Sequence, residues 1–269
     1  MDAVDVWAQI TTARMAARPW METLLRWTGR QAGAAPSVAE TLAAMDEAGV
    51  DIAQLSAWPG PEGSLISNEE VAVQIEAAPS RFRGLASVDL EQPMQAVREI
   101  RRWVDGKRFV GVRVVPWLWN LPPNDRRYYP IYAACVDLGV PFCTQIGHTG
   151  PLRRSETGRP IPYLEDVLLD FPELTVVGGH VGFPWLDELT TLAVKFPNFY
   201  VDTSAYALHR LPPAFIAWMK GVGRGRVMFG TNWPMLSPKQ CLAGLDGLAL
   251  AEDQREAFVS GVARRVFKL

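Results

Sequence analysis

The chain has 269 residues, of which 48% are hydrophobic and 21% charged, and these values are typical of a single α/β barrel domain with one large core. Lysine and arginine number 27 against 29 aspartate and glutamate, so the formal charge of -2 provides no basic field of the kind that binds nucleic acid or anionic membranes. We therefore expect a small-molecule partner.

Membrane and secretory signals are missing from the sequence. No apolar run approaches the roughly 18 residues of a membrane span, and the N-terminus lacks a basic region followed by an apolar stretch. We expect a cytoplasmic protein. The three cysteines, Cys135, Cys143 and Cys241, form no CxxC pair and are too scattered for a disulfide framework, so we predict buried thiols.

Short apolar runs rich in Val, Ile and Phe alternate with helical patterns along the whole chain, which predicts repeated βα units around a parallel sheet. The pattern never divides into two halves, so we predict one domain over residues 1–269. The predicted strands are near 4–10, 50–56, 83–89, 108–115, 140–146, 174–178, 198–202 and 226–230. Eight such units predict a (β/α)8 barrel.

The segment 37–48 shows how a helix is specified locally. Ser37 can cap its start, Glu40 lies three residues later as in a capping box, and Gly49 can end it. We therefore predict a helix here, followed at once by the strand "VDIAQLS".

The loops after the predicted strands are where we expect chemistry, because barrel active sites gather at the carboxyl ends of the strands. These loops contain "AWPGPEG", "PWLWNLPPNDRRYYP", "GHTGPLRRSETGRPIPY", "GHVGFPW", "TSAYALHR" and "TNWPMLSP". Long loops rich in Gly, Pro and Trp usually form a pocket.

Several of these segments resemble the amidohydrolase-related branch of the amidohydrolase superfamily. That branch includes metal-dependent decarboxylases of the aminocarboxymuconate and resorcylate type and a metal-free pyrone dicarboxylate lactonase. The resemblance lies in "VPFCTQIGHTGP", "FPELTVVGGHVGFPW", "FPNFYVDTSAY", "RVMFGTNWPML" and "ARRVFKL", in the order and spacing of the family. It implies a distorted (β/α)8 barrel, in agreement with the strand count.

Five positions carry the chemistry that the resemblance implies. His148 matches a histidine that is a metal ligand in metal-bearing relatives, and His180 matches one that positions water or substrate. Trp7 and Gln9 stand where the first strand usually carries two ligand histidines. Asn232 stands where these enzymes usually carry an aspartate that binds metal or transfers a proton.

These substitutions argue against a catalytic metal. Two imidazoles and two amide oxygens offer no negative charge, whereas catalytic divalent metals favour about three ligands that often include an anion. We therefore expect no cofactor. Zinc or manganese remains the alternative, with an aspartate from another loop as the missing ligand.

The histidines are our candidates for acid–base catalysis, since imidazole can transfer a proton in either direction near neutral pH. Asn232 can polarise a carbonyl or oxyanion but cannot act as a base. The alternative for His148 and His180 is a loop histidine bonded to local carbonyls, and for His209 we favour that structural interpretation.

Two further charged residues are candidates for substrate binding. Asp202 is the nearest carboxylate at the end of the seventh predicted strand, and its alternative role is a hydrogen bond to Ser204. Arg113 lies within an otherwise apolar strand, so its guanidinium either meets an anion or incurs a large desolvation penalty. It either faces the mouth and binds a substrate carboxylate, or pairs inside the barrel with Asp89 or Asp202.

Tryptophan is concentrated at one face of the predicted barrel. Six of the ten lie at strand ends or in the following loops: Trp7, Trp58, Trp117, Trp119, Trp185 and Trp233. We predict an aromatic cleft for a flat, unsaturated substrate, with loop packing as the alternative for part of the set. Trp7 shares one face of the first strand with Asp5 and Gln9, and we predict that its indole fills the metal's space as a floor beneath the substrate, while the Gln9 amide holds a carboxylate or carbonyl.

We conclude from the sequence that the protein is a metal-independent hydrolase or lyase for a small cyclic or aromatic carboxylated substrate. Lactone-type hydrolysis, decarboxylation and dehydration or isomerisation remain open. The alternatives are a metal-dependent decarboxylase with a depleted site and a non-catalytic barrel that binds a ligand. A homodimer is also left open.

Overall fold

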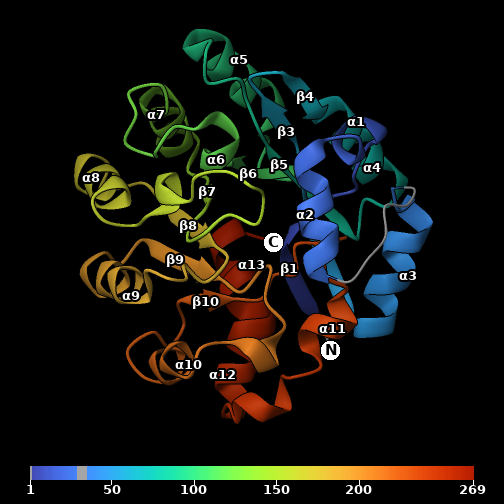
Figure 1. Ribbon diagram of the computed structural model, residues 1–269, viewed down its shortest axis with the longest axis vertical. Coiled ribbons are helices and arrows are strands. Elements are labelled where there is room, and N and C mark those ends of the chain that lie inside the picture. The colour runs from blue at the N-terminus through green and yellow to red at the C-terminus, as the bar shows by residue number, and fades with distance from the viewer. Residues whose placement is uncertain (1, 29–34) are drawn as a thin grey trace.

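The computed structural model describes residues 2–28 and 35–269, and its centre is one sheet of eight parallel strands rolled into a nearly closed barrel (Figure 1). The strand order is β1-β2-β5-β6-β7-β8-β9-β10. The strands are β1 (Ala3–Ala8), β2 (Val50–Ser56), β5 (Phe82–Ala86), β6 (Phe109–Val114), β7 (Phe142–Gln145), β8 (Val176–Gly179), β9 (Phe199–Asp202) and β10 (Val227–Met228). The predicted single-domain (β/α)8 barrel is confirmed.

The barrel closes between its first and last strands through the chain that follows β10. Val6 N donates to Phe229 O at 3.1 Å, Asn232 N to Trp7 O at 2.8 Å, and Gln9 N to Trp233 O at 3.0 Å. β10 is shorter than the predicted strand 226–230 because Phe229 N donates to Phe258 O in a π-helical turn instead of continuing the pairing with β9.

The helices surround the barrel in the order expected for βα units (Figure 1). They are α1 (Ala13–Ala16), α2 (Pro19–Thr28), α3 (Val38–Ala48), α4 (Asn68–Ala77), α5 (Pro93–Trp103), α6 (Pro116–Trp119), α7 (Tyr129–Leu138), α8 (Tyr163–Asp170), α9 (Leu186–Lys195), α10 (Pro213–Lys220), α11 (Pro238–Leu242), α12 (Glu252–Glu256) and α13 (Val262–Phe267). A short antiparallel pair, β3 (Trp58–Gly60) and β4 (Gly63–Ile66), follows β2.

The start and end of α3 are formed as the sequence predicts. Glu40 N donates to Ser37 Oγ at 3.2 Å, and Ser37 N donates back to Glu40 Oε2 at 2.8 Å. Gly49 ends the helix in the left-handed conformation with φ of 70°. The capping box is therefore confirmed.

The apolar core has two parts. The larger lies mainly between the strands and the surrounding helices. The smaller collects side chains from the barrel strands, among them Val4 from β1, Val110 from β6 and Met228 from β10, and packs them on Val262 and Phe267 of α13. Since Val4 and Val110 lie near the starts of their strands, α13 covers the end of the barrel opposite the loops that we expect to be functional.

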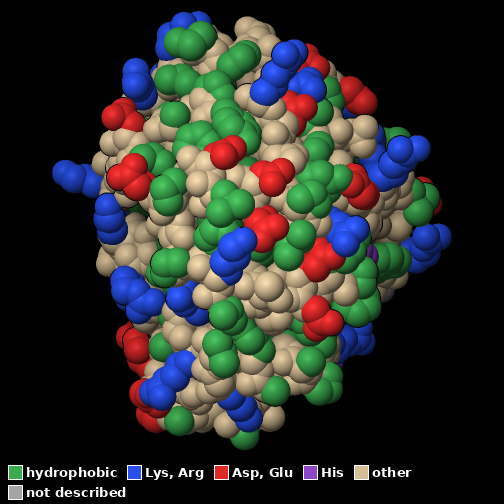
Figure 2. Space-filling model, turned by 90° about the vertical axis from the view of Figure 1, so that its left-hand side faces the viewer, with side chains coloured by type: hydrophobic (Ala, Val, Ile, Leu, Met, Phe, Trp, Pro, Cys, Tyr) green, Lys and Arg blue, Asp and Glu red, His purple; other side chains and the backbone are tan. Residues whose placement is uncertain are grey.

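The surface and the cysteines agree with the sequence expectations. The face in Figure 2 carries acidic and basic side chains interspersed with apolar ones. All three cysteines are buried and free. Among the residues that the structure describes, no helix is long and apolar enough to span a membrane.

Candidate active site

A cavity of about 710 Å³ opens at the carboxyl ends of the barrel strands. All three histidines of the chain, His148, His180 and His209, line it. Its apolar walls include four tryptophans: Trp20, Trp27, Trp58 and Trp117. Among the residues that the structure describes, no aspartate or glutamate lines the cavity. The cavity is therefore an aromatic pocket with imidazole as its main titratable group, a combination suited to a flat ligand.

One side of the cavity is formed by the segment that follows β1. α2 crosses in front of β1 in Figure 1. The lining residues from this segment are Thr11, Met15, Trp20, Met21, Leu24 and Trp27. Residues 11–27, which we call the cover segment, thus supply much of the apolar wall, while the strand ends supply polar groups.

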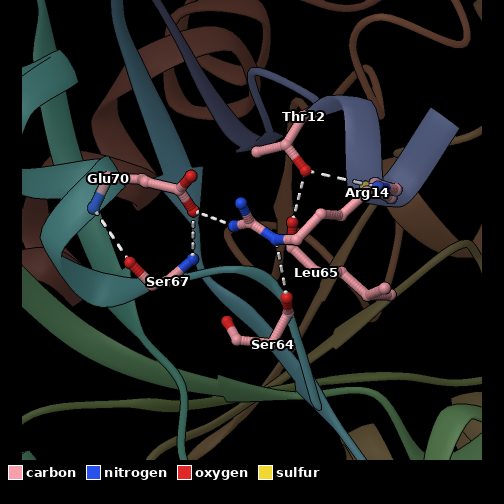
Figure 3. A network of polar contacts seen from close by, with 7 residues as sticks. Thr12, Arg14, Ser64, Leu65, Ser67 and Glu70 are labelled. Atoms are coloured by element: carbon pink, nitrogen blue, oxygen red, sulfur yellow. Dashed lines mark hydrogen bonds and ion pairs between the residues drawn. The ribbon is translucent and has the colours of Figure 1, made fainter. Parts of the chain in front are cut away.

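A polar network attaches the start of the cover segment to β4 and to the start of α4 (Figure 3). Thr12 Oγ1 donates to Leu65 O at 2.5 Å, and Arg14 Nε donates to Ser64 O at 3.0 Å. Arg14 also pairs with Glu70, which takes part in the cap of α4. The Arg14 side chain is 53% exposed, so its ion pair contributes little, and the part-buried bond from Thr12 to Leu65 is the firmer attachment of α1.

His180 ends a chain of hydrogen bonds that starts at a buried carboxyl group. Ser204 N donates to Asp202 Oδ1 at 2.9 Å, and Ser204 Oγ donates to the same oxygen. The hydroxyl proton is thus used on Asp202, so Ser204 Oγ accepts Nδ1–H of His180 across 2.6 Å. In this arrangement Nε2 of the neutral ring carries the lone pair, and we call Asp202, Ser204 and His180 the relay.

The surroundings of the relay keep the imidazole neutral. Burial, followed by the nearby Arg113 cation, lowers the pKa of His180 to about 3. Burial raises the pKa of Asp202. The lowered pKa keeps the imidazole of His180 neutral near pH 7.

Trp7 lies directly beneath His180, with ring centroids 4.5 Å apart. The indole is fully enclosed, with 0% of its surface exposed, so it has no face from which to contact a ligand. The prediction of an aromatic floor in contact with the substrate is thus replaced by a layered arrangement, in which His180 and Gln9 face the cavity and Trp7 supports them.

Arg113 forms the layer below Trp7. Its Cζ lies 3.8 Å from the centroid of the indole ring, and its Nη2 donates to Val6 O at 2.6 Å. Arg113 does not face the mouth and makes no direct ion pair with Asp89, whereas the buried Asp202 carboxyl group acts on it electrostatically. The interior location expected as one alternative is present, and the indole ring, the Val6 carbonyl and the nearby buried carboxyl groups of Asp202 and Asp5 all favour the cation. Burial lowers the pKa of Arg113.

Asp5 is a buried carboxyl group for which the sequence predicted no function. Its Oδ1 accepts Trp7 N at 3.1 Å and Thr231 N at 2.9 Å, and its Oδ2 accepts Thr231 Oγ1 at 2.5 Å. Burial raises the pKa of Asp5 to about 7. Asp5 thus connects β1 to the loop after β10. The only sign of this role in the sequence was a carboxylate within the apolar run "AVDVWA".

Gln9 and Asn232 meet at the rim of this closure. Gln9 Nε2 donates to Asn232 Oδ1 at 3.1 Å and also to Trp233 O. Asn232 therefore holds Gln9 in place through its oxygen, and its Nδ2 has no hydrogen-bond partner among the described residues. Both residues line the cavity.

The other predicted residues divide into two groups. His148, Trp58 and Trp117 line the cavity, and His148 Nδ1 lies 3.3 Å from Phe183 O, to which it donates. Trp233 does not belong to the lining, because its indole Nε1 donates to Thr41 Oγ1 of α3 at 3.2 Å.

Two lining residues that sequence reasoning did not predict are His209 and Arg210. Among the described residues that line the cavity, Arg210 is the only arginine or lysine. The sequence feature that could have indicated these two residues was the run "LHR" in the loop after the seventh strand.

The described residues do not fit a zinc or manganese centre. No group of three or more His, Cys, Asp or Glu side chains among residues 2–28 and 35–269 is placed to hold a metal ion. The cavity offers neutral imidazoles and amides, and neutral amides are weak ligands for these ions.

A family model described as Amidohydrolase matches residues 4–269. This chain belongs to the amidohydrolase family. The match covers nearly the whole sequence, and the relatives of this family member lie in the branch that the loop motifs indicated. Aromatic carboxylate decarboxylases are prominent among them.

Two curated relatives are γ-resorcylate decarboxylases. The enzyme from Rhodococcus jostii is 26% identical, with 76% of this chain and 75% of that protein covered. The enzyme from Polaromonas sp. JS666 is 24% identical with the same coverage. At these identities the comparison shows a shared family and not a shared substrate.

Solved structures agree in fold. A TIM-barrel protein from Bordetella bronchiseptica has a TM-score of 0.85 and 26% identity, covering 100% of this chain and 99% of that one. The 5-carboxyvanillate decarboxylase from Sphingomonas paucimobilis has a TM-score of 0.74 and 20% identity with the same coverage. A dihydroxybenzoic acid decarboxylase from Polaromonas sp. JS666, solved with manganese and 2-nitroresorcinol, has a TM-score of 0.73 and 19% identity, covering 100% and 97%.

Proposed function

We propose that this member of the amidohydrolase family is a lyase that removes carbon dioxide from a small aromatic or cyclic acid. The observation that carries the proposal is the relay of Asp202, Ser204 and His180, which ends at an unprotonated Nε2 on an aromatic cavity. The decarboxylase relatives favour this reaction over the lactone-type hydrolysis that the sequence left open.

The reaction replaces a carboxylate by a proton. The ring carbon that bears the carboxylate gains a proton, the bond to the carboxylate carbon breaks, and its electron pair returns to the ring as carbon dioxide leaves. His180 Nε2 accepts a hydrogen bond from a hydroxyl on the ring and so increases the electron density of the ring. His148 is the proton donor, because it lines the same cavity and its Nε2 has no protein partner among the described residues.

Binding in this proposal uses the walls and the rim. The tryptophans stack on the ring, and Arg210 at the exposed rim attracts the carboxylate. Since no acidic side chain belongs to the described lining, an anionic substrate meets no like charge there.

Manganese accompanies decarboxylases among the solved relatives. Here the donor set does not fit such an ion, so the proposed steps use the imidazoles alone. Elemental analysis of protein purified without chelator tests this point separately, and a near-stoichiometric metal would favour the metal-dependent alternative.

The decisive experiment is release of carbon dioxide from a panel of hydroxylated benzoates and non-aromatic cyclic acids, measured with and without EDTA. We expect turnover of at least one acid that persists in EDTA and falls about 100-fold or more in His180→Gln. Turnover of lactones but not of acids would overturn the assignment. Ligand binding without turnover, unaltered in His148→Ala and His180→Ala, would instead indicate a non-catalytic barrel.

A further inference from the structure

Polar groups are distributed unevenly around the cavity. Every imidazole, amide and guanidinium among the described lining residues comes from β7, β8, β9, β10 or β1, or from the loops that follow these strands. The three neighbouring strands β2, β5 and β6 contribute only Trp58 and Trp117 to the described lining. The cavity therefore has a polar side, where His180 presents the relay, and an apolar side.

Three tryptophans in mutual contact form the wall of the apolar side. The ring of Trp117 lies 5.2 Å from that of Trp20 in an edge-to-face arrangement and 6.2 Å from that of Trp58. The three side chains, which we call the tryptophan wall, keep 9%, 6% and 5% of their surface accessible for Trp20, Trp58 and Trp117, and all three line the cavity. Since Trp117 contacts both partners, the wall is ordered before a ligand arrives, which lowers the entropy cost of binding.

Helix α2 extends from the polar side to this wall. Trp20, Leu24 and Trp27 follow one another at helical spacing and all line the cavity. The ring of Trp27 lies 5.7 Å from that of His148, whereas the ring of Trp20 contacts Trp117. Seven residues of helix span about 10 Å along its axis, so a ligand that reaches from the imidazole to the wall is longer than one benzene ring.

The size of the cavity agrees with a longer ligand. Its volume is about 710 Å³, and cavities of roughly 300–1,000 Å³ enclose ligands of drug size. An acid with a single ring, bound at the polar side, would leave water against the tryptophan wall, which is unfavourable for an apolar surface. Met15 and Met21 complete the apolar side, and their unbranched thioethers can adjust to the outline of a ligand.

We propose that the preferred ligand is a ring acid that carries a second, uncharged ring on the side away from its carboxylate, and that the tryptophan wall binds this second ring. The inference rests on the proposed function for the acid at the polar side. It makes Trp20, Trp58 and Trp117 specificity-determining residues and leaves the bond-breaking step to the histidines.

The test is calorimetric binding of benzoate, biphenyl-4-carboxylate and biphenyl-2-carboxylate to the full chain. None of these probes carries the ring hydroxyl that the proposed reaction uses, so binding is measured without turnover. The two biphenyl probes have the same composition, so a difference between them reports the direction of the second ring and not its hydrophobicity. We expect biphenyl-4-carboxylate to bind about 10- to 100-fold more tightly than benzoate and about 10-fold more tightly than its isomer.

Variants locate the second ring. Trp58→Ala and Trp117→Ala should each weaken the binding of biphenyl-4-carboxylate about fivefold or more and change that of benzoate by less than about twofold. Leu236→Ala is the matched control, because Leu236 lines the same cavity from the loop after β10. Equal binding of the two isomers, or a preference lost in Leu236→Ala and kept in both tryptophan variants, would overturn the proposal. If a variant fails to fold, the comparison of isomers on the unmodified chain still decides.

Carbon dioxide release separates this inference from the proposed function. We expect a higher kcat/KM for 4-phenylsalicylate than for salicylate. Equal kcat/KM for the two acids, together with equal binding of the biphenyl isomers, would overturn the inference and leave the proposed function standing. A preference for biphenyl-4-carboxylate that depends on the tryptophan wall, without carbon dioxide release from any acid, would support the binding site and overturn the proposed function.

Discussion

The substitution Asp5→Asn should stabilise the protein at alkaline pH and leave it nearly unchanged in acid. The oxygen of the introduced amide can still accept the backbone N–H groups of Trp7 and Thr231, and the amide nitrogen can donate to the Thr231 hydroxyl, which rotates to accept. The substitution therefore preserves the hydrogen bonds and removes only the buried charge.

The magnitude follows from the pKa of Asp5, which is raised from 3.8 to about 7 by burial. A carboxyl group with a raised folded-state pKa contributes stability below pH 3.8, and that contribution is lost as pH rises through about 7. Linkage gives a loss of roughly 1.5 kcal/mol by pH 5 and roughly 4 kcal/mol by pH 8. The effect of the substitution should thus differ by about 2–3 kcal/mol between these two pH values.

Urea unfolding of both proteins at pH 5 and pH 8 measures this difference directly. Other groups titrate in the same window, but they are common to both proteins and cancel in the comparison. A substitution that destabilises equally at both pH values would refute the reasoning, since it would mean that Asp5 is not held protonated by burial.

Three further outcomes are expected. Ser204→Ala should lower kcat about 10- to 100-fold with little change in KM, because it breaks the relay without touching the cavity wall; an unchanged kcat in steady-state assays would count against the relay. Arg113→Met should raise the pKa of His180 from about 3, which NMR titration of the ring would show, whereas an unmoved titration would mean that the cation has no influence. Gly179→Ala should destabilise by about 2–3 kcal/mol in thermal unfolding, because an added Cβ would overlap the Trp7 ring; Gly247→Ala, with open space around it, is the control, and equal effects would contradict the packing argument.

The fold was predictable because its signals are local. Strand position follows from short apolar runs, and the ends of α3 follow from Ser37, Glu40 and Gly49, all of which act on neighbours in sequence. The order of the loops around the mouth then follows from barrel topology alone.

The candidate site was predictable only at the level of position. His148, His180, Gln9 and Asn232 reach the cavity as expected from the strand ends. The burial of Trp7 depends on Arg113 from a distant strand, and no pattern in the first strand contains that information.

Trp233 illustrates the same limit. The loop after the last strand gives its position, but the hydroxyl of Thr41 on α3, which takes its indole N–H, determines the direction of its side chain. Side-chain direction therefore required the tertiary structure.

The cover segment separates recognition from reaction along the chain. Residues 11–27 precede the second barrel strand and supply apolar wall, whereas the relay lies beyond residue 179 on other strands. Exchanging this single stretch between homologous barrels would change which ring shapes are admitted and leave the proton-handling groups in place. On the proposed function, replacement of this one short segment alters the wall that the ring meets without altering the relay.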